Sequence, residues 1–188
     1  MRHAAALTHR PAVRADLPAL RDLANTAIEE LQRGHLTPGQ ITASHAIMGI
    51  DSQLVDDGTY VVVEADGRIA GCGGWSRRAT LYGGDHSGGR DPGLLDPERD
   101  AARIRAMYTH PSFARRGVAR SILETCELAA AAEGFRRLEL VATMAGLSLY
   151  TRYGFRTVEL TDDRSTGVSI PLVRMAKDIP PDLRRGRA

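Results

Sequence analysis

The residues whose types and spacing carry the clearest chemistry surround Gly117. Arg115 and Arg116 precede this glycine, Arg120 follows it, and apolar residues then recur at helical spacing as far as Gly134. A glycine turn that opens a helix presents unpaired backbone N–H groups, which together with the helix dipole favour an anion such as phosphate. Glycine also lets the backbone approach a ligand closely. The segment therefore predicts a phosphate-binding turn flanked by arginines.

This turn resembles the diphosphate-binding motif of the GNAT superfamily, the acyl-CoA-dependent N-acyltransferases. The usual form of that motif is Gln or Arg, two residues, Gly, one residue, then Gly or Ala. Gly117 and Ala119 match it, whereas Ala114 stands where the Gln or Arg is expected. The segment from Leu149 to Phe155, with the pattern Leu-Tyr-x-x-x-Gly-Phe, resembles a second family signature at about the usual distance. The loop of nucleotide hydrolases fits less well, because no Gly-Lys-Ser or Gly-Lys-Thr follows the glycine.

The resemblance implies that the chain binds acetyl-CoA as a co-substrate. The adenosine diphosphate end is expected at the backbone N–H groups of residues 115–120, and pantetheine along the strand that precedes them. A backbone N–H of that strand is also expected to polarise the thioester oxygen. Thr143 stands where many members have Asn. The donor-binding residues implied in this way are Met107, Tyr108, Thr109, Arg115, Arg116, Gly117, Val118, Ala119, Arg120 and Thr143.

By the same resemblance, Tyr150 is the general acid that gives its proton to the CoA sulfur. An ordinary tyrosine has a pKa of about 10, and a thiolate of pKa about 8.5 readily accepts a proton from a positioned donor. On residue type alone, Tyr150 reads as a partly buried aromatic residue of a helix. Tyr153 is the rival for the acid role, and its spacing suits packing better.

No general base is evident from the sequence. The strand before the glycine turn offers Arg103 and Arg105 on one face and no acid, and a guanidinium group stays protonated. These arginines hold a substrate carboxylate or phosphate if they face the acceptor, although an exposed strand face decorated by arginine is commoner. Either a remote group acts through water or the amine arrives neutral. The candidates for a remote group are Glu29, Glu30, Asp85, His86 and Glu98.

Other reactive residue types favour structural roles. His110 precedes Pro111 at the end of a strand and reads as a solvated or capping histidine. Trp75 is the single tryptophan and is expected in the core. Cys72 and Cys126 are expected to be buried thiols, because no second Cys or His lies nearby at metal-ligand spacing. We therefore expect no metal site.

Composition narrows the classes of partner. Lys and Arg total 25 against 23 Asp and Glu, so the formal charge of +2 argues against bulk binding to nucleic acid. Lys177 is the only lysine. No stretch approaches the roughly 20 apolar residues of a membrane span, and the first residues lack the apolar core of a signal peptide. We expect a cytoplasmic protein without nucleic acid or membrane partners, and a possible homodimer.

Periodicity predicts an alternation of strands and helices. The expected fold class is mixed α/β (α+β), a GNAT-like single domain over residues 1–178 followed by a flexible tail at 179–188. By resemblance, it contains a twisted, mostly antiparallel sheet of about seven strands, helices on both faces, and a central parallel pair that forms a V-shaped cleft. Residues 81–100 are rich in Gly and Pro and predict a long loop, either a substrate lid or a mobile insertion. The expected strands are 4–11, 60–64, 69–76, 103–109, 138–141, 155–160 and 168–175, and the expected helices are 16–31, a region after 37, 116–134 and 144–153.

The sequence therefore predicts an N-acetyltransferase that moves an acetyl group from acetyl-CoA to a primary amine of a small molecule or peptide by direct transfer in a ternary complex. An alternative is a catalytically silent domain that binds acyl-CoA as a sensor or interaction module. A nucleic-acid-binding protein that uses the arginines near Gly117 and the arginine-rich C-terminal tail is a weaker alternative, since aromatic interleaving is absent.

Overall fold

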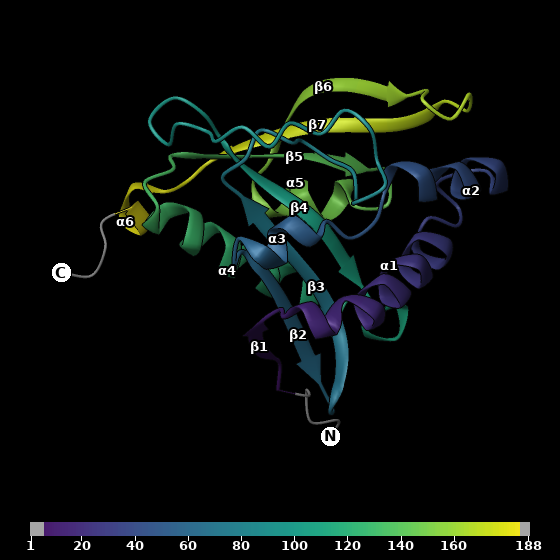
Figure 1. Cartoon of the computed structure of the whole chain (residues 1–188), viewed down its shortest axis with the longest axis horizontal. Helices are drawn as coiled ribbons and strands as arrows, with labels where there is room; N and C mark the ends of the chain where they lie inside the picture. Colours follow the sequence, from purple (N-terminus) through teal and green to yellow (C-terminus); the bar gives the residue numbers. More distant parts are fainter. Residues whose placement is uncertain (1–5, 185–188) are drawn as a thin grey trace.

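The computed structural model describes residues 6–184 as one seven-stranded sheet with helices packed on both faces (Figure 1). Ala4 and Ala5, expected in the first strand, lie outside the described residues. The strands are β1 (Thr8–Pro11), β2 (Tyr60–Ala65), β3 (Arg68–Ser76), β4 (Ala102–Thr109), β5 (Arg137–Thr143), β6 (Arg156–Asp163) and β7 (Ile170–Asp178). The helices are α1 (Leu17–Leu31), α2 (Pro38–Ile47), α3 (Ser52–Asp56), α4 (Val118–Ala132), α5 (Leu147–Tyr153) and α6 (Pro181–Arg184), with short 3-10 turns at Arg14–Asp16 and Pro111–Phe113.

The strand order is β1-β2-β3-β4-β5-β7-β6, and every neighbouring pair is antiparallel except β4 and β5. A right-handed crossover through a helix is the usual way to join parallel strands, and α4 supplies the helix here. The buried face of α4 packs with α5 in one core, while α1 and α3 pack in a second core on the opposite side of the sheet (Figure 1). The expected mixed fold with a central parallel pair is therefore confirmed.

Local sequence explains most of these elements. The β2–β3 hairpin turns at Asp66 and Gly67, which both have positive φ angles of 53° and 69°, as the Asp-Gly pair predicted. Helix α2 begins at the capping box formed by Thr37 and Gln40, whose side chains each accept a hydrogen bond from the other's backbone N–H. Such local signals fix where an element begins or turns.

The parallel pair opens into a gap. Strands β4 and β5 pair only at Ala102 with Leu138 and at Arg103 with Glu139, after which they separate. On its other side β4 carries a bulge, since the register against β3 shifts and Ala106 has a φ of 49°. The Tyr60 hydroxyl donates a 2.6 Å hydrogen bond to the Ala106 carbonyl, which stabilises the bulge. The gap gives side chains access to both faces of the sheet.

Some expectations differ from the structure. Helix α3 was not predicted, because five residues are too short to show periodicity. The segment expected to be a loose tail begins with Ile179, which is fully buried, and continues into α6. Residues 185–188 lie outside the described part. Residues 81–100 contain no helix or strand, as predicted, and only a single bridge pairs Arg78 with Leu94. A single domain ending at residue 178 stays a prediction.

Candidate active site

A groove lies where β4, the start of α4 and α5 meet. Its volume is about 610 Å³, which is in the usual range of small-molecule sites. We call it the donor groove. All the implied donor residues except Arg116 line it; those that do are Met107, Tyr108, Thr109, Arg115, Gly117, Val118, Ala119, Arg120 and Thr143. Arg116 instead lies over the Phe113 ring, 5.1 Å from its centroid, and 3.9 Å from the Asp66 carboxylate.

The glycine turn has the backbone shape that its sequence suggested. Gly117 precedes the first residue of α4 and has a φ of 86°, while Arg115 has a φ of 61°. A left-handed conformation at a non-glycine residue costs on the order of 1 kcal/mol or more and is often found at functional sites. No atom outside the adjoining residues lies within 4 Å of a Cβ added at Gly117, so the conformation, and not crowding within the chain, requires glycine there. The first N–H groups of α4 lack helical partners.

The donor groove carries positive charge and no acid. Arg115, Arg120 and Arg152 line it, and no Asp, Glu or His does. Arg120 is also paired with Glu124 at 2.9 Å on the surface of α4. Arg152 comes from α5 and was not predicted. Its place inside the second family signature, in the last turn of the helix, was the only signal available. The groove therefore suits a ligand with several negative charges.

Tyr150 lies at the inner end of the donor groove and is 9% exposed. Its ring packs edge-on against Phe155 with centroids 5.9 Å apart, and a Cβ at Gly146 would come within 2.9 Å of the ring. Burial raises the pKa of Tyr150 above its ordinary value, which keeps the hydroxyl protonated. Among residues 6–184 the hydroxyl has no hydrogen-bond partner. It is free to donate to a ligand.

Tyr153, the rival for the acid role, is held elsewhere. Its hydroxyl donates a 2.8 Å hydrogen bond to the Glu127 carboxylate on α4. Lys177 pairs with the same carboxylate, and its Nζ lies 5.3 Å from the centre of the Tyr153 ring. Glu127 is buried and the Lys177 side chain is 13% exposed. Tyr153 does not line the donor groove, so its hydroxyl has a packing role.

A second cavity of about 90 Å³ adjoins the donor groove. We call it the inner pocket. Strands β4, β5 and β7, the connector between α2 and α3, and the loop at residues 81–83 line it. The residues that line both cavities are Met48, Met107, Tyr108, Thr143 and Tyr150. The two cavities therefore meet beside the Tyr150 side chain.

Arg105 and Asp51 fix the wall of the inner pocket. Arg105 is buried and donates to the Asp51 carboxylate at 3.0 Å, the Thr80 carbonyl at 2.9 Å and the Gly83 carbonyl at 2.7 Å. Burial lowers the pKa of Arg105 from its high ordinary value, and the Asp51 carboxylate opposes that shift. These contacts tie the loop after residue 80 to β4.

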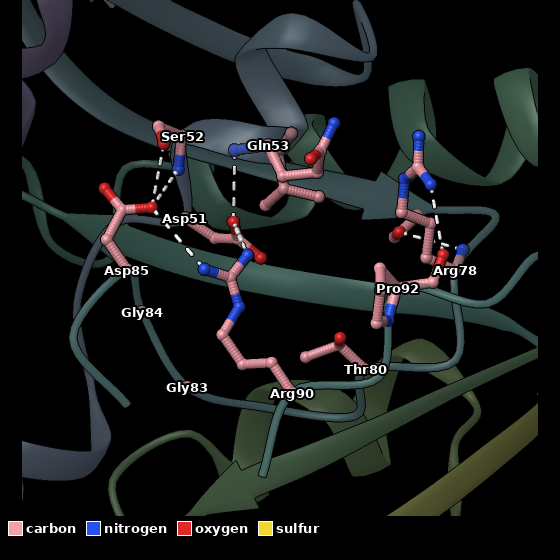
Figure 2. Close-up of polar contacts among 12 residues, drawn as sticks. Asp51, Ser52, Gln53, Arg78, Thr80, Gly83, Gly84, Asp85, Arg90 and Pro92 are labelled. Atoms are coloured by element: carbon pink, nitrogen blue, oxygen red, sulfur yellow. Dashed lines mark hydrogen bonds and ion pairs between the residues drawn. The ribbon is translucent and has the colours of Figure 1, made fainter. Parts of the chain in front are cut away.

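Arg90 and Asp85 extend the same network. Figure 2 shows Arg90 between Asp51, with which it pairs, and Asp85, which lies 3.8 Å away. The Asp85 carboxylate accepts from the Ser52 backbone and hydroxyl at 2.8 Å each, and Arg21 reaches it at 3.1 Å. The loop at 81–90 is thus hydrogen-bonded to the start of α3. Asp51 and Arg90 were missed by the sequence analysis, because nothing local distinguishes them from surface residues.

The expectation of an exposed arginine face on β4 is wrong. Arg105 is 3% exposed, and the Arg103 side chain is 15% exposed and pairs with Glu139 on β5. Both arginines are neutralised by carboxylates that are distant in sequence, which is the condition for burying a charge. Arg105 lines the inner pocket, whereas Arg103 lines neither cavity.

None of the remote base candidates lines either cavity. Asp85 is engaged with Ser52 and Arg21, and His86 lies 2.7 Å from the His45 carbonyl. The other candidates are Glu29, Glu30 and Glu98, which are on the surface. Within residues 6–184 no group of three or more His, Cys, Asp or Glu side chains could hold a metal ion. No helix in that part of the chain is long and apolar enough to cross a membrane.

The remaining predicted structural residues behave as expected. His110 caps the turn at Pro111–Phe113, because its Nδ1 accepts a 3.2 Å hydrogen bond from the Ser112 N–H. Trp75 is buried and packs edge-on against Phe135. Cys72 and Cys126 are buried free thiols, and burial raises the pKa of each to about 12.

Comparisons with known proteins agree with this geometry. The family model described as the acetyltransferase (GNAT) domain matches residues 56–157. A GCN5-related N-acetyltransferase from Rhodopseudomonas palustris is 18% identical, with 93% of this chain and 95% of that chain covered at a TM-score of 0.67. The PaiA N-acetyltransferase from Thermoplasma acidophilum, solved with coenzyme A, is 13% identical, with coverages of 92% and 99% and a TM-score of 0.61.

A third structure, the putative acetyltransferase yncA from Salmonella typhimurium with acetyl-CoA, is 19% identical, with coverages of 93% and 95% and a TM-score of 0.60. At these identities the structural likeness concerns the fold. The search of curated proteins found no match.

Proposed function

Because this chain belongs to the GNAT acetyltransferase family, we propose that it moves an acetyl group from acetyl-CoA to a primary amine of a small molecule or peptide. The observation that carries the proposal is the meeting of the donor groove and the inner pocket beside Tyr150. Two cavities that open onto one hydroxyl allow donor and acceptor to be bound together. That arrangement supports direct transfer in a ternary complex.

The donor groove suits coenzyme A. Its arginines and the N–H groups at the start of α4 are placed to hold the phosphates of the adenosine diphosphate end. Met107, Tyr108 and Thr109 extend from there toward Tyr150 and would run beside pantetheine. Beyond Arg103 the edge of β4 has no partner on β5, so backbone groups on that side are available to a ligand. Ala114 lines the groove with an apolar side chain, so at this position only backbone groups would bind the phosphates.

The chemistry proposed at the junction is a displacement at the thioester. The nitrogen lone pair of the amine attacks the carbonyl carbon, and a C–N bond forms as the oxygen becomes negative. Backbone N–H groups of β4 would stabilise that oxyanion. When the C–S bond breaks, the Tyr150 hydroxyl donates its proton to the thiolate. The nitrogen loses its own proton to water, and the tyrosinate recovers one from water.

The test measures donor binding and transfer separately. Calorimetry with acetyl-CoA is expected to show one site per chain, and free thiol is expected to appear when an amine is added. Lack of acetyl-CoA binding would exclude the proposal. Tight binding with no thiol release from any amine would instead favour a silent acyl-CoA sensor, an alternative supported by the lack of any carboxylate or imidazole on the lining of either cavity.

A further inference from the structure

The lining of the inner pocket limits which amines can be the acceptor, an inference that rests on the proposed function. The pocket shares lining residues such as Met107, Tyr108 and Tyr150 with the donor groove, so an amine bound there lies beside the place where a thioester would lie. Its volume of about 90 Å³ is smaller than the ~150 Å³ of an apolar cavity known to admit benzene. The enclosed part of the pocket therefore holds only a few non-hydrogen atoms around the reacting amine, while the pocket itself is open on one side.

The lining of the inner pocket is mostly apolar. Its side chains include Ile47, Met48, Leu81, Ile104, Leu140 and Leu172. Three tyrosines, Tyr82, Tyr108 and Tyr150, are the uncharged titratable groups on the lining. The Tyr108 hydroxyl is occupied by the Gly49 N–H at 2.8 Å, and the Tyr82 hydroxyl donates to Asp163 at 2.8 Å. Tyr150 is left as the free hydroxyl.

Arg105 is the one residue of this lining that is charged at neutral pH. Its charge belongs to a chain of ion pairs in which Arg105, Arg90 and Arg21 alternate with Asp51 and Asp85. Asp51 and Asp163 each accept a hydrogen bond from a lining residue but are not themselves part of the lining.

A protonated amine is therefore disfavoured in the inner pocket. An apolar lining penalises any charge that leaves water, and no carboxylate lines the pocket to pair with an ammonium group. The Arg105 guanidinium is already paired with Asp51 and offers an ammonium group no partner. A neutral amine escapes this penalty and needs no general base to remove a first proton.

We infer that the acceptor is a small, weakly basic amine that is largely neutral at physiological pH, such as a hydroxylamine ether, and that polyamines and lysine side chains are excluded. A lysine amine has a pKa of about 10.4, so only about one molecule in a thousand is neutral near pH 7.4. The difference in neutral fraction alone thus gives weakly basic amines a kcat/KM about 10² to 10³ times that of lysine-like amines. The missing general base of this site is explained by the substrate it accepts.

The experiment compares two amines of equal size, methoxyamine and ethylamine, with acetyl-CoA and the full chain. Methoxyamine is expected to have a kcat/KM at pH 7 at least 100-fold higher. Because an N–O bond also makes nitrogen a better nucleophile, the pH profile is the decisive readout. The kcat/KM of ethylamine is expected to rise about tenfold per pH unit from 7 to 9, while that of methoxyamine stays flat.

Two further acceptors complete the panel. Spermidine and a short peptide with a blocked α-amine and one lysine are expected to react at least 100-fold more slowly than methoxyamine at pH 7. Faster reaction of either one, or a flat profile for ethylamine, overturns the inference. These outcomes all require turnover with acetyl-CoA. They are therefore distinct from a failure of the proposed function, which shows as absent donor binding or as binding without thiol release from any amine.

A pair of variants tests the charge of the pocket directly. Leu81 lines the inner pocket from the loop and is partly exposed, so it tolerates a polar side chain. Leu81→Glu supplies a carboxylate, and Leu81→Gln matches its size without charge. The ratio of ethylamine to methoxyamine turnover at pH 7 is expected to be about tenfold higher in Leu81→Glu than in Leu81→Gln. Equal ratios in the two variants count against the inference.

Discussion

At the scale of single residues, Tyr150 combines a free hydroxyl with a tightly held ring. Phe155 packs edge-on against the ring, Gly146 leaves just enough room beside it, and the Phe155 N–H donates to the Tyr150 carbonyl at 3.0 Å. The ring is therefore held in a fixed position on the lining of both cavities. Fixed geometry is what a proton donor needs, since it must be in place when the thiolate leaves.

The first prediction concerns this hydroxyl. Tyr150→Phe is expected to lower kcat by a factor of about 100 or more, which is the usual rate contribution of a positioned general acid. The Kd for acetyl-CoA is expected to change less than twofold. Steady-state kinetics and calorimetry measure the two quantities. Tyr153→Phe is the matched control, because it removes a hydroxyl that is bonded to Glu127 and lies outside the donor groove. Equal losses of kcat in both variants would contradict the role of Tyr150.

At the scale of elements, the Asp51 network joins three parts of the chain that would otherwise be independent. Asp51 precedes α3, Arg105 is on β4, and Arg90 is on the loop between β3 and β4. The loop is long enough to be mobile, yet Thr80, Gly83 and Asp85 are each hydrogen-bonded to β4 or α3, and Arg90 is bonded to the residue that caps α3. The wall of the inner pocket is therefore held by ion pairs of which only Arg105 belongs to the lining.

The second prediction follows from the burial of that network. Asp51→Asn is expected to lower the free energy of unfolding by about 3 kcal/mol or more, because it leaves Arg105 buried without its carboxylate. Denaturant titration measures the change. Asp56→Asn provides the comparison, since Asp56 pairs with the exposed Arg14 and the loss there is expected to stay below about 1 kcal/mol. If the two variants lose similar amounts of unfolding free energy, burial is not what makes the Asp51 ion pair stabilising.

Sequence predicts elements better than it predicts contacts between them. The Asp66-Gly67 turn and the apolar stripe of α1 are local, so the hairpin and the helix were found from periodicity and turn chemistry. The bulge at Ala106 has no such signal, because it depends on how β4 registers against β3. The burial of Arg105 depends on Asp51, which is 54 positions away in the chain. The residues that line the donor groove were therefore largely predictable from the sequence, whereas the ion pairs beside the inner pocket were not.

At the scale of the whole molecule, carboxylates paired with arginine stabilise the fold at many points around the sheet. The hydrogen bond from Arg10 holds the pKa of Asp16 below its usual value, and the one from Arg78 does the same for Asp57. Arg10 belongs to β1, and Arg78 belongs to the segment after β3. Charge pairing thus links the ends of strands to the helices around them.

The third prediction is the pH dependence that these pairs cause. A carboxyl whose folded pKa lies below its unfolded value of about 3.9 binds fewer protons in the folded state, so it stabilises the fold at higher pH. The contribution is complete above about pH 5 and is lost as the pH falls through the folded pKa. Denaturant titrations between pH 6 and 2 are expected to show that the free energy of unfolding falls by about 1–3 kcal/mol through Asp16 and Asp57 together. Asp57→Asn is expected to make the dependence shallower, and an unchanged slope would contradict this account.

The single lysine of the chain has a consequence for a protein that works in the presence of an acylating agent. Thioesters slowly modify exposed lysine side chains without any enzyme, and arginine, which supplies every other basic side chain apart from histidine here, stays protonated and unreactive. Lys177 is the only such target, and it is largely buried and paired with Glu127. The folded chain is thus chemically resistant to self-acylation on its side-chain amines, and incubation with millimolar acetyl-CoA is expected to leave the mass of the peptide that contains Lys177 unchanged.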